Sequence, residues 1–382
     1  MSEPSALEPP TAARAPGLPA PLRALLVVTL LYTFLVGVKL LEGGIKGLGS
    51  DFTDVLFENV TNPVAGLFVG ILATVLVQSS SVATSTIVGL VASGVLNVEA
   101  AVPMIMGANI GTTVTNTIVS LAHLRRSDEF RRAFTAATMH DLFNVMAVAV
   151  LLPLELATGV LSRSARGIAE FVSGSSGATF DSPIKGAVQW GAGRVDDVLE
   201  VFANGDVLAV LGIAVGIAFI FVTLAFITKN MRVLVAARIE RSLNAALARS
   251  GLIGMAVGMI VTIAVQSSSI TTSILIPLVA SGILVVRNAY PITLGANIGT
   301  TITALLAALG TGALDGLTIA VTHTLFNVAG IVLIYSIPRV RYIPVQLADR
   351  LARVALRHKS LALGYTLGMF ILVPIIGIVV LR

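Results

Sequence analysis

Two clusters of hydroxyl and amide side chains follow apolar stretches that are too short to cross a membrane. Each cluster reads QSSS, the first beginning at Gln78 and the second at Gln266. The apolar run before the first, residues 63–77, makes roughly 22 Å of helix, whereas the hydrocarbon layer is about 30 Å thick. Each cluster is therefore predicted to lie at membrane depth, where polar backbone is tolerated only beside protein or a wet cavity. We interpret both as binding segments, the alternative being hydroxyls that bond to their own helix or aid packing.

A second motif, GANIGTT, occurs at residues 107–113 and again at 295–301. Its two glycines predict a broken helix, which Thr112 or Thr300 caps where it restarts. The amide end of a broken helix attracts anions, and the carbonyl end, with Asn and hydroxyl oxygens, suits Na⁺. The alternative is a kink that serves packing.

Basic residues are sparse around these motifs. No Lys or Arg occurs between Lys46 and Arg125, and only Arg287 occurs between Arg249 and Arg339. A multiply charged anion bound here must therefore be neutralised by co-bound cations, hydroxyl donors and helix ends. This pattern favours coupling to a cation over a basic anion pore, and it does not name the anion.

Asp141 is an acid inside an otherwise apolar segment, directly after His140. An ionisable side chain at membrane depth is costly, so it is a functional hypothesis by default, here for a cation. The alternatives are a local pair with His140 or an interfacial position. We interpret His140 and His323 as hydrogen-bonding residues between helices.

The composition sets the class of protein. Of 382 residues, 55% are apolar and 12% are charged, and the mean hydropathy is +0.94. A soluble protein carries about a quarter charged residues, so an ordinary soluble enzyme and a disordered protein are excluded. The net charge of +5 indicates loops held at the cytoplasmic face and not a nucleic-acid partner. The absence of Cys excludes thiolate metal sites and disulfides.

The chain contains an internal repeat. Residues 78–121 and 266–309 are identical at 24 of 44 positions without a gap. The flanking segments extend this likeness to two units, 24–154 and 207–337, which make up most of the chain.

The two units are predicted to insert with opposite orientation. Loops 123–132, 229–250 and 338–359 are rich in Arg and therefore read as cytoplasmic. Helix 133–154 then runs outward, whereas its equivalent 316–337 runs inward. Inverted repeats are typical of secondary transporters, whose substrate sites lie near the midplane where the repeats meet.

The remaining segments complete an all-α polytopic membrane protein with broken or re-entrant helices. We expect a disordered cytoplasmic tail at 1–23, an external linker at 155–206, a basic cytoplasmic loop at 338–360 and a final transmembrane helix at 361–382 with an external C-terminus. The expected spans are 24–41, 133–154, 207–228, 316–337 and 361–381.

These motifs resemble those of type II sodium-dependent phosphate cotransporters. The likeness covers about 60–360 and includes the doubled QSSS and GANIGTT motifs, DEFRRAF at 128–134, HDLFN at 140–144 and LLPLE at 151–155. It implies symport of Na⁺ and inorganic phosphate, with the QSSS residues of both repeats at the substrate and ions. The linker lacks the large, glycosylated, Cys-bearing loop of animal members, which suggests a bacterial member in the inner membrane.

The resemblance assigns roles to individual side chains. The expected donors to phosphate are Ser79, Ser80, Ser267 and Ser268. The expected Na⁺ ligands or site-organising residues are Gln78, Ser81, Asn109, Thr112, Gln266, Ser269, Thr271, Thr272, Asn297 and Thr300, with Asp141 as a further cation or coupling residue. No catalytic residue and no resident cofactor are expected. The expected partners are phosphate, Na⁺ and the lipid bilayer, and a homodimer is one assembly that we consider.

An elevator-like motion of the motif regions against helices 24–41 and 207–228 is the expected mechanism. Three alternatives remain open at this point: a sodium-coupled dicarboxylate carrier, an ion channel, and an intramembrane hydrolase that uses a Ser with His140. The sequence contains no TVGYG filter and no GxSxG elbow in either repeat, which disfavours the last two.

Overall fold

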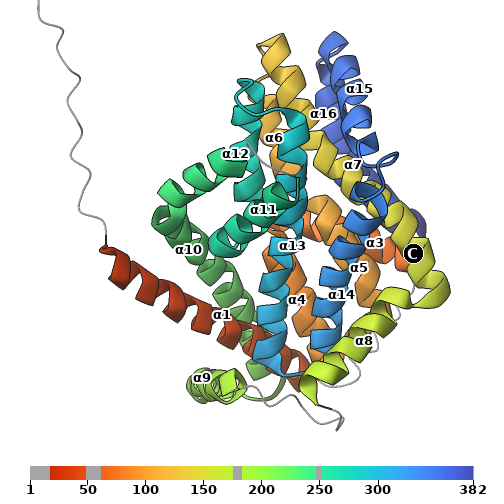
Figure 1. The fold of residues 1–382 in the computed structure, drawn as a ribbon. Coiled ribbons are helices and arrows are strands. Elements are labelled where there is room, and N and C mark those ends of the chain that lie inside the picture. The colour runs from red at the N-terminus through yellow and green to blue at the C-terminus, as the bar shows by residue number, and fades with distance from the viewer. Residues whose placement is uncertain (1–17, 49–61, 175–182, 247–250, 382) are drawn as a thin grey trace, which may run out of the picture.

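The computed structural model describes residues 18–48, 62–174, 183–246 and 251–381, and every regular element in them is a helix (Figure 1). This confirms the prediction of an all-α membrane protein. Six helical stretches are long and apolar enough to cross a membrane: α1 (Ala20–Gly47), α7 (Ser127–Thr158), α10 (Gly205–Ala246) as far as Ile227, α13 (Val286–Thr311), α14 with η1 (Leu314–Gly330, Ile331–Tyr335), and α16, η2 and α17 (Ser360–Leu367, Gly368–Leu372, Val373–Leu381). The sequence predicts all of these except α13, whose apolar pattern is interrupted by Gly, Asn and Pro.

Four shorter apolar helices form two hairpins. In the first repeat α3 (Pro63–Val77) is followed by α4 (Ser80–Ser93), and in the second α11 (Gly251–Val265) is followed by α12 (Ser268–Ala280). Each hairpin turns at the Gln-Ser pair that opens its QSSS motif. The predicted interruption of the helix at both motifs is therefore confirmed.

The two repeats interlock through these hairpins. Helix α3 packs on α5 (Val98–Gly111) of its own repeat, whereas α4 packs on α13 and α14 of the other repeat. In the same way α11 packs on α13, whereas α12 packs on α6 (Val114–Leu121) and α7 of the first repeat. Each turn is therefore held between both repeats, near the centre of the molecule.

The repeat extends further than the sequence alone indicates. Helices α8 (Val160–Ser173) and α15 (Ile343–Arg357) occupy equivalent positions, 183 residues apart. Helix α8 packs on α14 and α15 packs on α7, so each lies against the last long helix of the other repeat. Helix α9 (Pro183–Leu199), also within the predicted external linker, packs on α1.

Some boundaries differ from the prediction. Helix α1 begins at Ala20, so the end of the predicted tail is helical, and α10 continues to Ala246 through most of the predicted loop 229–250. The segment 338–360, predicted as a basic loop, contains helix α15. Residues 1–17, and most of the Gly- and Ser-rich part of the linker, lie outside the described residues.

The predicted break at GANIGTT is wrong for the second repeat. Helix α13 runs unbroken through residues 295–301, and in the first repeat the interruption falls between α5 and α6 at Thr112 and Thr113. The predicted caps are wrong as well, because the hydroxyl groups of Thr112 and Thr300 donate to carbonyl oxygens one turn earlier in their helices.

The glycines of this motif serve close packing instead. A Cβ atom at Gly107 would collide with the carbonyl oxygen of Leu67 in α3, and one at Gly295 would collide with the equivalent oxygen in α11. Gly70 and Gly258 face the backbone of α5 and α13 in the reverse direction. Small residues let helices approach this closely in membranes, so the glycines fix the distance between each hairpin and the helix behind it.

Replacing Gly258 with Ala should therefore lower stability strongly. Overpacking a tight contact costs about 1–3 kcal/mol, here against a backbone oxygen that cannot move aside easily. Gly43→Ala in α1 is the matched control, because its Cβ would meet no atom within 4 Å and Ala favours a helix by about 1 kcal/mol over Gly. Thermal unfolding of both variants in detergent tests this, and equal melting temperatures would contradict the packing role.

Candidate functional site

The two hairpin turns have the same unusual backbone. Gln78 and Gln266 have φ angles of 55° and 56°, and no other non-glycine residue in the described part of the chain has a positive φ. Such a conformation is costly for a residue with a side chain and is concentrated at functional sites. Each glutamine amide donates to a carbonyl oxygen three residues earlier, at 2.6 Å and 2.7 Å, and so closes the last turn of α3 or α11.

The serine after each glutamine begins the next helix. Ser79 and Ser267 are extended, and their hydroxyl oxygens accept hydrogen bonds from the backbone N–H groups of Val82 and Ile270, both at 3.3 Å. A capping hydroxyl that accepts a bond retains its own proton for donation. Each turn therefore combines free amide groups, the positive end of a helix and a hydroxyl donor.

Both turns face one cavity of about 380 Å³. Its polar wall is made by the two QSSS motifs and α6: Gln78, Ser79, Ser81, Thr115, Gln266, Ser267 and Ser269. Its apolar wall includes Phe221, Leu224 and Ala225 of α10. The N-termini of α4 and α12 thus meet at a single space, which is a favourable arrangement for an anion.

The structure separates the four serines that the resemblance assigns to phosphate. Ser79 and Ser267 line the cavity, as do Ser81 and Ser269. Ser80 and Ser268 do not line it; the Ser268 hydroxyl is buried without a hydrogen-bond partner.

Ser80 lies instead in a narrow crevice behind the first turn. Besides Gly111 and Val114, the residues around this crevice all carry a side-chain oxygen: Thr74, Gln78, Ser79, Ser80, Thr112, Thr115 and Ser269. The Thr74 hydroxyl is buried there without a partner, whereas the equivalent Thr262 donates to Thr271 at 2.9 Å. A set of neutral oxygens at the carbonyl end of a broken helix is the kind of site that holds Na⁺ in transporters.

Hydroxyl groups from both repeats form hydrogen bonds that fix the side chains of the two turns. Thr115 donates to the side-chain oxygen of Gln78 at 3.4 Å, and the equivalent Thr303 donates to that of Gln266 at 3.0 Å. Ser81 of the first repeat also reaches Thr303 of the second at 3.5 Å. Thr115 and Thr303 are not among the site residues predicted from the sequence, although their identity at equivalent positions of the repeat is a usable signal.

A buried polar network connects the repeats beside the cavity. His140 lies 3.3 Å from Asn116 and 2.6 Å from Asn297, and Asn297 donates to Asn144 at 2.8 Å. Because the Asn297 amide nitrogen is used in that bond, its oxygen accepts from Nε2 of His140, so Nδ1 of the imidazole is the acceptor. Thr272 completes the network by donating to Asn116 at 2.8 Å.

The equivalent residues of the second repeat form no such network. Both ring nitrogens of His323 are buried without a partner, and Asn327 reaches Asn109 at 3.4 Å. Of the predicted site residues, Asn109, Thr271, Thr272 and Asn297 therefore support the hairpins and do not line the cavity.

Asp141 of α7 does not line the cavity, and its side chain contacts α6 and α16. One carboxylate oxygen accepts hydrogen bonds from Thr117 at 3.2 Å and from Tyr365 at 3.1 Å, and the other is buried without a partner. The neighbouring His140 bonds to asparagines instead. No cluster of three or more His, Asp or Glu side chains suited to a metal ion occurs among the described residues.

Comparison with known proteins gives a consistent set of relatives. The chain matches the profile of the Na⁺/Pi-cotransporter family over residues 33–174 and 219–343. Sodium-dependent phosphate transport protein 2A of Oryctolagus cuniculus is 34% identical over 91% of this chain and 66% of its own length. Protein 2B of Homo sapiens is 32% identical over 92% of this chain and 64% of its own length, and protein 2A of Ovis aries is 34% identical over 92% and 67%. The chain spans about two thirds of the length of these relatives. No solved structure matches it significantly.

The unequal environments of the two histidines give a stability test. His140→Ala leaves Asn297 and Asn116 with unpaired buried groups, at a cost of about 1–3 kcal/mol for each unsatisfied group. His323→Ala removes the same volume without breaking a bond, so it is the matched control. We expect His140→Ala to unfold at clearly lower temperature in detergent, and equal losses in both variants would contradict the network.

Proposed function

Because the chain belongs to the Na⁺/Pi-cotransporter family, we propose that it is a secondary transporter that couples the movement of Na⁺ to the uptake of inorganic phosphate. The observation that carries this proposal is the single cavity between the two QSSS turns. The membrane is a bacterial inner membrane in this proposal, with the arginine-rich end of the molecule in the cytoplasm. No catalytic step is part of it.

The four serines of the cavity wall are the proposed phosphate donors. Ser79 and Ser267 each retain a hydroxyl proton, and Ser81 and Ser269 lie in the first turns of α4 and α12. A tetrahedral anion can accept bonds from hydroxyls on opposite sides and from the free amides of both helices. The four donors come from both repeats, so one phosphate requires both turns.

Sodium supplies the missing positive charge in this proposal. The residues that line the cavity include no Lys or Arg, so phosphate binds only with cations. The crevice around Thr74 and Ser80 offers neutral oxygens close to the phosphate donors, since Gln78 and Ser79 belong to both spaces. Sharing of these residues couples the two ligands physically.

The equivalent helices α1 and α10 stand differently toward the cavity, which supports alternating access. In α1, Leu35 and Leu41 pack against Gly310 of α13 and Gly89 of α4. In α10, which is the repeat equivalent of α1, Phe221 and Leu224 face the cavity instead. We infer that transport exchanges these two environments through motion of the hairpins against α1 and α10, which is an elevator-like movement.

Uptake of ³²P-phosphate into proteoliposomes tests the function directly. We expect uptake with external Na⁺, little with K⁺ or choline, and a Hill coefficient for Na⁺ above one, because more than one cation is needed to neutralise the anion. Arsenate should compete and succinate should not. Equal uptake in choline, or competition by succinate alone, would contradict the proposal.

The shared site predicts coupling between Ser81 and Ser269. A hydrogen bond to a charged group contributes about 1.5–3 kcal/mol, so each Ser→Ala change should raise the KM for phosphate by about 10- to 150-fold. The double variant should fall short of the product of the two effects, because residues that share a ligand are not independent. Ser85→Ala, which is buried in α4 away from the cavity, is the control. Strictly multiplicative effects would indicate two separate sites.

Asp141 is the remaining cation candidate. Its one unpartnered, buried oxygen is available to a cation, so Asp141→Asn should raise the Na⁺ concentration for half-maximal uptake by at least about tenfold, or 1.4 kcal/mol. Asp315→Asn removes an equal charge from a half-exposed position and serves as the control. An unchanged Na⁺ dependence would assign Asp141 to structure alone.

A further inference from the structure

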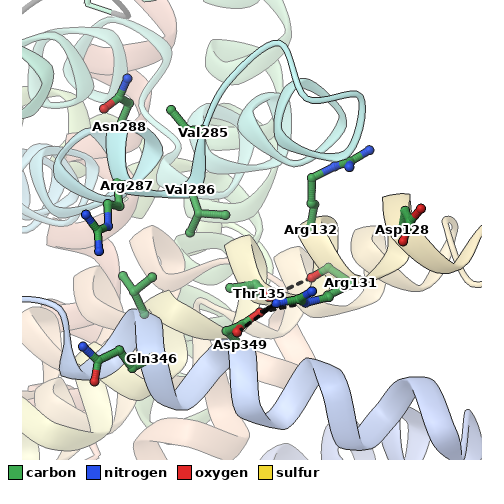
Figure 2. Close-up of a pocket in the computed structure, with 11 residues that line it drawn as sticks. Asp128, Arg131, Arg132, Thr135, Val285, Val286, Arg287, Asn288, Gln346 and Asp349 are labelled. Carbon is green, nitrogen blue, oxygen red and sulfur yellow. Dashed lines mark hydrogen bonds and ion pairs between the residues drawn. The ribbon is translucent and has the colours of Figure 1, made fainter.

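A second cavity of about 670 Å³ is lined by no residue of the QSSS turns and lies at the end of the molecule that the arginine-rich loops mark as cytoplasmic. It is an open pocket lined by the first residues of α7, α13 and α15 (Figure 2). Its charged lining consists of Arg131, Arg132, Arg287, Asp128 and Asp349. It shares no residue with the proposed transport cavity.

Two of these arginines are held in place without a carboxylate. Arg132 donates through Nε to the carbonyl oxygen of Ala280 at 2.8 Å, and Arg287 lies over the ring of Tyr342 at 4.9 Å. Neither has an acidic partner within ion-pair distance among the described residues. In Figure 2 they lie on opposite sides of the Arg131–Asp349 pair, and the Arg132 side chain points away from Arg287. Their positions are thus fixed while their charge remains uncompensated.

The acids of the lining do not cancel this charge. Asp349 is paired with Arg131 at 2.8 Å and also with Arg353 at 3.0 Å, so it is already neutralised. Asp128, in the first turn of α7, offsets part of the charge, so the three arginines and two aspartates of the lining leave one net positive charge. The N-termini of α13 and α15 also open here without a side-chain cap, which adds positive potential.

The repeat supplies an internal comparison. The position of Arg287 is occupied in the first repeat by Glu99, and the position of Arg132 is occupied in the second repeat by Asp315. Helices α8 and α14 pack at that end as α15 and α7 do at this one. At the opposite end the equivalent helices pack in the same way with Glu99 and Asp315 at these positions. The fold therefore does not require arginine at either position.

We propose that this pocket binds a phosphate-bearing anion at a site separate from the transport cavity. Guanidinium groups match phosphate oxygens in a bidentate fork, and basic pockets between membrane helices at the cytoplasmic side suit phospholipid headgroups. The same chemistry is offered by two sources, the headgroup of an anionic phospholipid and free inorganic phosphate. The binding is independent of Na⁺, since the charge is supplied by arginines.

Two binding measurements on the purified full chain separate the sources. The first is native mass spectrometry from micelles that contain equal amounts of phosphatidylglycerol and phosphatidylcholine. The second is equilibrium dialysis with ³²P-phosphate in potassium chloride without Na⁺, where the proposed transport site is inactive. Each compares the wild type, the variant Arg132→Gln/Arg287→Gln, and the control Arg350→Gln, which removes an exposed arginine of α15 outside the pocket.

We expect the double variant to bind at least tenfold more weakly in one measurement, with Arg350→Gln unchanged. Loss in the lipid measurement identifies a headgroup, and loss in the dialysis identifies free phosphate. If the wild type binds neither ligand, or if the double variant and Arg350→Gln behave alike, the proposal is overturned. Arg287→Gln alone, at an exposed position, replaces the double variant if that variant does not fold. Because neither measurement uses Na⁺ or uptake, the result is independent of the proposed function.

Discussion

A helix that stops inside a hydrocarbon layer leaves amide and carbonyl groups that water cannot reach, and this constraint organises the protein. The two hairpins stop at Gln78 and Gln266, where the glutamine amides bond to carbonyl groups of the ending helix and the serine caps bond to amide groups of the next helix, beside the shared cavity. Such a turn is stable only when protein surrounds it. Two features surround the turns with protein. The glycines bring α5 and α13 against the hairpins, and α4 and α12 pack on helices of the opposite repeat.

The sequence of the repeats is more symmetric than their environments. Gln78 and Gln266 have the same conformation, yet His140 is fully bonded where His323 is not, and Thr262 is bonded where Thr74 is not. The proposed alternating access of inverted repeats accommodates such differences, since equivalent positions differ whenever one side is open and the other closed.

The sequence predicts the features that depend on local pattern. The length of the apolar run 63–77 places the first interruption correctly, since α3 ends at Val77. The effect of the glycines in GANIGTT is not predictable in this way, because it depends on the helix packed against them: α13 stays intact where α11 meets it. The partners of Asp141 and His140 lie as far as 224 and 157 residues away, so no local pattern could identify them. The orientation of α4 and α12 about their own axes decides which serines line the cavity, and the sequence does not determine that orientation.

The central claim is that the two QSSS turns form one phosphate site. Isothermal titration of the purified protein with phosphate, in saturating Na⁺ and again in K⁺, measures it most directly. The difference between the two titrations counts only the Na⁺-dependent sites, so an arginine pocket that binds phosphate without Na⁺ does not contribute. The account predicts one Na⁺-dependent phosphate for each chain. Two Na⁺-dependent phosphates for each chain would mean that each turn binds its own ligand, and would contradict it.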